Sequence, residues 1–162
     1  MRRSVQLLAF ASLILVFALV GQGMEIGAKV TTQTPSLVLQ AEWDVSPNLT
    51  MGVFVVPPLE ALISPGTVQT PPLTIGLMAK YRFTYIHPAF VPYLGVAGSL
   101  TLQGTETTIG MDVLAGASLY LGRDFHLFAE AAFSVFPPPD VATWYDVTGW
   151  YKGLYLGFGF RL

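Results

Sequence analysis

Bulky apolar residues alternate with small or polar ones along the final segment of the chain. Between positions 150 and 162 the even-numbered residues are apolar apart from Lys152, and the odd-numbered ones include Gly157, Gly159 and Arg161. A period of two predicts a β-strand with one apolar face. The alternation is clear in three other segments and weaker in four, namely 73–83, 109–121 and 125–136, then 25–30, 37–45, 49–56 and 90–100. The pattern therefore predicts eight strands, most of them near the roughly 9–11 residues with which a tilted strand crosses a bilayer.

The predicted strands are joined by connections of two kinds. Three are short turns and four are longer loops, at 46–48, 85–88 and 122–124, and at 31–35, 57–72, 101–107 and 137–149 respectively. Short turns at one end and longer loops at the other are typical of an antiparallel up-and-down barrel whose two termini lie on the periplasmic side.

The composition indicates that this barrel is a membrane protein. Apolar residues make up 52% of the 162-residue chain and charged residues 11%, whereas soluble domains carry about 25% charge. High hydrophobicity excludes intrinsic disorder, and a pI near 5.5 argues against a nucleic-acid-binding protein. Without cysteine, disulfides and thiol chemistry are excluded. We therefore predict an all-β, eight-stranded antiparallel up-and-down transmembrane β-barrel, since a chain without a spanning helix crosses a bilayer as a closed barrel.

The N-terminal segment resembles a secretory signal. Arg2 and Arg3 precede an apolar run over 7–20, and Gly21 and Gly23 supply the small residues before a cleavage site. We predict a signal peptide at 1–23 and a barrel domain at 24–162; the alternative is an uncleaved membrane anchor. Cleavage would change the formal net charge from −2 to −4, because two of the eight basic residues are removed.

Either face of these strands could point outward. In a membrane barrel the apolar face meets lipid, whereas in a soluble, lipocalin-like barrel it lines the interior. Nine glycines share the polar face, which favours a crowded interior: 27, 52, 76, 95, 110, 116, 153, 157 and 159. That face also carries five acids and four bases, too few charges to make an exterior soluble: Glu25, Lys29, Glu42, Asp44, Lys80, Arg82, Asp112, Glu130 and Arg161. We therefore expect the apolar face to meet lipid and these nine residues to form an internal ion-pair network.

The last ten residues, Gly-Leu-Tyr-Leu-Gly-Phe-Gly-Phe-Arg-Leu, alternate aromatic and small side chains. In this the chain resembles the small eight-stranded outer-membrane barrels of the OmpA/OmpX type. The resemblance implies a location in the bacterial outer membrane and contact with its lipid. It also implies that Tyr155, Phe158, Phe160 and Leu162 act as the signal read by the barrel-assembly machinery, although that signal commonly ends in Phe.

The resemblance further implies an interior filled by side chains. If the strands run as predicted, all of the charged residues named above except Asp112 gather in the periplasmic half. Acids and bases should pair there, because a lone buried charge costs several kcal/mol. Glu25 and Arg161 are the expected pair, since the first and last strands must meet to close the barrel. A structural plug is favoured over an ion pathway or gate.

Catalysis has little support in the sequence. Lipid-modifying barrels of this size use a His/Ser pair or polar residues near the outer leaflet. The two histidines here, His87 and His126, are predicted at the periplasmic end. We therefore expect no enzyme activity, no catalytic or metal-binding residues and no cofactor.

The proline-rich loops 57–72 and 137–149 are the most variable surface that the sequence offers. We predict a structural or surface-interaction role, with a surface ligand contacted through these loops. One alternative is a narrow transporter or binder of a small or hydrophobic molecule, which would pass Phe54, Val56, Phe136 and Tyr151 at the outer mouth. Another is a lipid-modifying enzyme.

Overall fold

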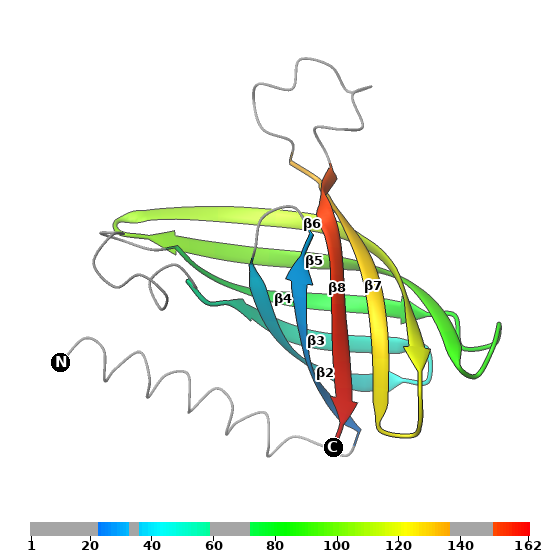
Figure 1. Cartoon of the computed structure of the whole chain (residues 1–162). Coiled ribbons are helices and arrows are strands. Elements are labelled where there is room, and N and C mark those ends of the chain that lie inside the picture. The colour runs from blue at the N-terminus through cyan, green and yellow to red at the C-terminus, as the bar shows by residue number, and fades with distance from the viewer. Residues whose placement is uncertain (1–22, 33–35, 59–71, 137–150) are drawn as a thin grey trace.

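The structure is a computed structural model that describes residues 23–32, 36–58, 72–136 and 151–162. They form one closed barrel in which each strand pairs antiparallel with the next and β8 pairs with β1 (Figure 1). The eight strands are β1 (Met24–Thr31), β2 (Leu37–Ser46), β3 (Leu49–Val56), β4 (Leu73–Arg82), β5 (Phe90–Gln103), β6 (Glu106–Tyr120), β7 (Phe125–Ser134) and β8 (Tyr151–Arg161). The predicted all-β, eight-stranded up-and-down barrel is therefore confirmed.

We call the end of the barrel at which β1 begins and β8 ends the inner end, and the opposite end the outer end. The first and last strands meet at the inner end, where the Leu162 amide donates a hydrogen bond to the Met24 carbonyl at 2.9 Å. None of the described residues belongs to a helix long and apolar enough to cross a membrane. The predicted signal peptide and most of loops 57–72 and 137–149 lie outside the described residues.

One predicted loop is wrong. The connection expected at 101–107 is a tight hairpin, because β5 continues to Gln103 and β6 begins at Glu106. Only Gly104 and Thr105 join the two strands, and Gly104 has a φ of 61°. A glycine with positive φ at the first of two turn residues is typical of hairpins. The threonines of this segment favour strands, and the Thr74 and Thr101 hydroxyls hydrogen-bond at 2.8 Å between β4 and β5.

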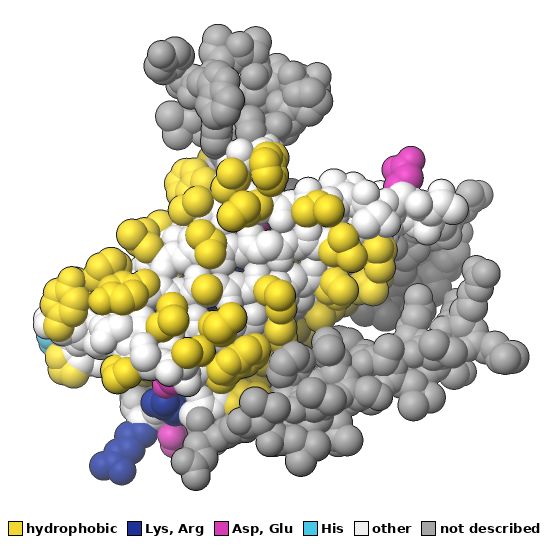
Figure 2. Space-filling view, turned by 180° about the vertical axis from the view of Figure 1, so that it is seen from behind, with side chains coloured by type: hydrophobic (Ala, Val, Ile, Leu, Met, Phe, Trp, Pro, Cys, Tyr) yellow, Lys and Arg dark blue, Asp and Glu magenta, His cyan; other side chains and the backbone are white. Residues whose placement is uncertain are grey.

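The two faces of the barrel differ sharply in polarity. Figure 2 shows hydrophobic side chains spread over the described strands, with few charged side chains among them. Leu77 on β4 is 66% exposed, whereas Glu130 on β7 is 0% exposed. A soluble, lipocalin-like barrel requires the opposite arrangement. The outward-facing apolar side chains are those of a transmembrane barrel.

Candidate functional site

Glycines make room for large side chains inside the barrel. Four rings each lie against a glycine directly opposite on the neighbouring strand: Phe54 on Gly76, Tyr93 on Gly116, Phe128 on Gly157 and His126 on Gly159. A Cβ atom added at any of these glycines would come within 2.6 Å of a ring atom. The glycines on the polar face therefore let aromatic rings fit into a narrow interior.

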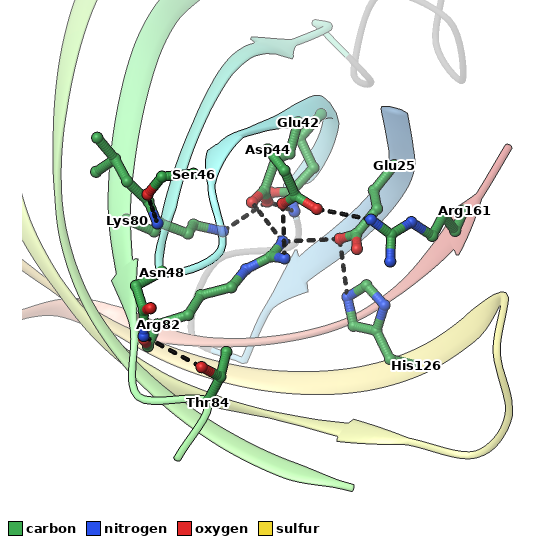
Figure 3. A network of polar contacts seen from close by, with 12 residues as sticks. Glu25, Glu42, Asp44, Ser46, Asn48, Lys80, Arg82, Thr84, His126 and Arg161 are labelled. Atoms are coloured by element: carbon green, nitrogen blue, oxygen red, sulfur yellow. Dashed lines mark hydrogen bonds and ion pairs between the residues drawn. The ribbon is translucent and has the colours of Figure 1, made fainter. Parts of the chain in front are cut away.

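Arg82 is the centre of the charged contacts near the inner end (Figure 3). Its Nη2 lies 2.9 Å from Glu25 Oε2 and 3.7 Å from Glu42 Oε2, and its Nη1 lies 3.1 Å from Asp44 Oδ1. Strands β1, β2 and β4 supply these residues. One guanidinium thus joins three carboxylates on two other strands.

Glu130 is a second centre, deeper in the barrel. Its side chain is fully buried, forms an ion pair with Lys29, lies 3.3 Å from Lys80 Nζ and accepts a hydrogen bond from the Tyr93 hydroxyl at 3.0 Å. Lys80 also binds Glu42 at 2.7 Å. Lys80 therefore connects the contacts of Glu130 with those of Arg82.

The expected pair of Glu25 with Arg161 is wrong. The two residues are directly opposite in the β1–β8 ladder, as barrel closure required. However, Arg161 Nη2 reaches Asp44 at 2.6 Å, and Glu25 pairs with Arg82. Side chains of residues that are directly opposite in a ladder project side by side. The long side chain of Arg161 can therefore bind a carboxylate on β2, which is one strand farther away than β1.

We call this set of eight residues the inner ion network: Glu25, Lys29, Glu42, Asp44, Lys80, Arg82, Glu130 and Arg161. It contains four acids and four bases, so its formal charge is zero. Sequence reasoning missed two of its polar neighbours, although alternation along β5 and β2 places both on the inward face. Tyr93 donates to Glu130, and Gln40 donates to Glu42 at 2.7 Å.

Asp112, the ninth predicted residue, lies apart from this network and pairs with Lys152 at 2.7 Å near the outer end. The alternation had placed Lys152 on the apolar, outward face. The ladder between β7 and β8 shifts register between Ala132 and Phe133, which are opposite Gly153 and Tyr151. Lys152 is the extra residue of this bulge, and the bulge turns its ammonium group towards Asp112.

The same bulge changes the position of one predicted mouth contact, Tyr151. Tyr151 lies opposite Phe133 on the outward face, with ring centroids 5.6 Å apart, so its predicted place inside the mouth is wrong. Phe136 is 63% exposed and does not line the cavity of about 250 Å³ that lies inside the outer half of the barrel. Phe54 and Val56 do line that cavity.

Two spaces bordered by described residues of the interior differ greatly in size. The cavity of about 250 Å³ lies on the outer side of the inner ion network, and we call it the outer cavity. Lys29 and Glu130 border its deep end. Within the network itself, a void of only about 10 Å³ lies among residues such as Glu42, Arg82 and His126. A void of that size holds about one water molecule.

The predicted C-terminal assembly residues do not share one face. Phe158, Phe160 and Leu162 point outward and are between 49% and 67% exposed. Tyr155 points inward, where the Lys29 ammonium lies 4.9 Å from its ring centroid. The apolar outer row of β8 is thus formed without Tyr155.

The two histidines have different surroundings. His87 lies in the connection between β4 and β5, where its Nδ1 accepts a hydrogen bond from the Ala89 amide at 3.1 Å. His126 lies inside the barrel, with Nε2 4.0 Å from Glu25 Oε2. Among the described residues there is no cluster of three His, Cys, Asp or Glu side chains suited to a metal ion.

Solved structures share this architecture. A de novo designed transmembrane β-barrel aligns with a TM-score of 0.62 and 15% identity, covering 86% of this chain and 95% of the design. The N-terminal β-barrel domain of Pseudomonas aeruginosa OprF aligns with a TM-score of 0.58 and 15% identity, covering 87% of this chain and all 100% of that domain. The chain has the fold of the small outer-membrane barrels.

A further solved structure aligns less well. Neisserial surface protein A aligns with a TM-score of 0.49 and 18% identity, over 86% of this chain and 92% of that protein. No protein-family model matches the chain, and no curated protein matches it either. The likeness to known barrels therefore concerns the fold.

Proposed function

We propose that this protein is a barrel of the bacterial outer membrane with a structural or surface-interaction role, and that its interior is closed to ions. The observation that carries the proposal is the inner ion network. Arg82 and Glu130 each bind side chains from other strands, and Lys80 joins the two groups. Because the network is electrically neutral and encloses space for about one water molecule, it favours a plug over a pathway.

The proposed location rests on the outward apolar face, the barrel fold and the predicted signal peptide at 1–23. In this proposal, the outward row of Phe158, Phe160 and Leu162 is recognised during barrel assembly. Loops 57–72 and 137–149 contact a surface ligand, and the protein is not an enzyme.

Conductance across a planar lipid bilayer tests the closed interior. The folded protein should give no current steps, whereas an open porin inserted in the same way gives a clear signal. The double variant Glu42→Ala/Lys80→Ala removes a bound acid and base together, so that the interior stays neutral but widens within the network. This variant should conduct.

The control is the double variant Asp112→Ala/Lys152→Ala. It removes an equally neutral pair near the outer end and leaves the inner ion network intact, so it should remain silent. Current steps from the unaltered protein would contradict a closed interior. Silence of both double variants would show that other groups close the barrel.

A further inference from the structure

Along β2 and β4, the inward side chains change from apolar or hydroxyl-bearing near the outer end to charged near the inner end. On β4, Thr74 and Met78 line the outer cavity, and the next inward residues, Lys80 and Arg82, belong to the inner ion network. On β2, Val38 lines the cavity before Glu42 joins the network. The barrel therefore holds an outer chamber of about 250 Å³ over a charged layer.

At the deep end of this chamber, the charged side chains that the structure describes are paired with each other. Lys29 and Glu130 form an ion pair there, and their side chains are 8% and 0% exposed. Nearer the mouth, Asp112 is paired with Lys152. Among the described residues, two acids and two bases thus line the chamber, and each is already bound to an opposite charge. A charged occupant would have to break one of these pairs or be buried without a partner, which is costly.

The uncharged part of the lining is mixed. Val38, Phe54, Met78, Ala97 and Leu114 supply an apolar surface. Hydroxyl groups line it as well, from Ser36, Thr74, Ser99 and Thr101. A hydroxyl can both donate and accept a hydrogen bond, so the chamber can hold a molecule with an apolar body and a hydroxyl or carbonyl group.

The volume limits the size of the occupant. An apolar cavity of about 150 Å³ holds benzene, and pockets for drug-sized molecules span about 300–1,000 Å³. We propose that the outer cavity is a binding site for a small uncharged amphipathic molecule, larger than benzene and carrying a hydroxyl or carbonyl group. That the site is closed at its inner end rests on the proposed function; the binding itself does not.

The chain offers its own reporters for a test. Met78 lines the outer cavity and is 4% exposed, whereas Met51 and Met111 lie on the lipid-facing surface and are 43% and 41% exposed. In protein with ¹³C-labelled methionine methyl groups, folded in lipid nanodiscs, 2-phenylethanol should shift the Met78 signal in a saturable way. Met51 and Met111 should show only the gradual change caused by probe dissolved in lipid.

Two charged analogues share the probe's aromatic body. Phenylacetate and 2-phenylethylammonium should bind at least about tenfold more weakly, because each brings a charge without a partner. Equal binding of either would overturn the preference for uncharged molecules. Absence of a saturable Met78 shift with 2-phenylethanol would overturn the site.

Filling the cavity should abolish binding. Ala97→Leu places extra methyl groups in the lining, and Ala132→Leu does so on another strand if the first variant fails to fold. The matched control is Ala129→Leu, an exposed position on the outward face of β7. Loss of binding in a filled variant and retention in the control support the proposal. An unchanged Met78 shift in a folded filled variant overturns it. Conductance measures the closed inner end separately, so the two proposals can fail independently.

Discussion

At the scale of single residues, the packing of the barrel interior depends on pairing a large side chain with a small one. A ring and a glycine face each other across neighbouring strands, as Phe128 and Gly157 do between β7 and β8. The same complementarity holds for charge, since Arg82 joins carboxylates from two other strands. In both cases the partner of a side chain lies on another strand, so each interior substitution affects at least two strands.

Gly157→Ala should destabilise the barrel by about 1–3 kcal/mol, because the new methyl group would overlap both the Ala28 carbonyl oxygen and the Phe128 ring and force them to move. The ring's Cζ lies only 2.6 Å from the position of such a Cβ. Urea unfolding in lipid vesicles measures the effect. Gly98→Ala is the control, because a Cβ there has no neighbour within 4 Å. Equal stability of the two variants would contradict the steric explanation.

At the scale of elements, each strand has one lipid-facing and one interior row. The rows follow from the alternation except where a bulge intervenes, as at Lys152 in β8. An extra residue reverses the faces of everything beyond it, which explains why Tyr151 lies outside the barrel and Lys152 binds Asp112.

Leu77→Arg should cost about 2–4 kcal/mol of stability in lipid vesicles, because Leu77 lies near the middle of β4 on the outward face. Leu121→Arg, in the connection after β6, should cost only about 0–1 kcal/mol near the interface. Urea titration of both variants measures the difference. On a water-facing surface, both changes would fall within about 0.5 kcal/mol of zero, and that result would contradict a membrane-spanning barrel.

At the scale of the whole molecule, closure couples the ends of the chain. β1 and β8 pair over seven residues of each strand, from Glu25 opposite Arg161 to Thr31 opposite Tyr155. The inner ion network then crosses the interior between strands that are not neighbours, such as β1 and β4 through Glu25 and Arg82. The barrel is therefore held both around its circumference and across its diameter.

The folded barrel should resist SDS and migrate at a different apparent mass until it is heated. Arg82→Ala should lower the temperature of this change, because it leaves the buried Glu25 carboxylate without its base, a loss of about 3–5 kcal/mol. Arg123→Ala is the control, since Arg123 is an exposed residue in the connection between β6 and β7. Electrophoresis after heating to a series of temperatures compares them. The same transition temperature for both variants would argue against a stabilising network.

The sequence by itself determined the strands, their order and the polarity of their faces. These properties are local: a period of two marks each strand, and Gly, Pro and Asp mark several of the turns. It also identified nine of the charged interior residues, because alternation places them on one face, but it missed Lys152, which the bulge in β8 turns inward. Only the tertiary structure decided their partners, as Arg161 with Asp44 shows. Partner choice depends on register, on a bulge and on the reach of side chains across the barrel, and none of these is encoded in the period of a single strand.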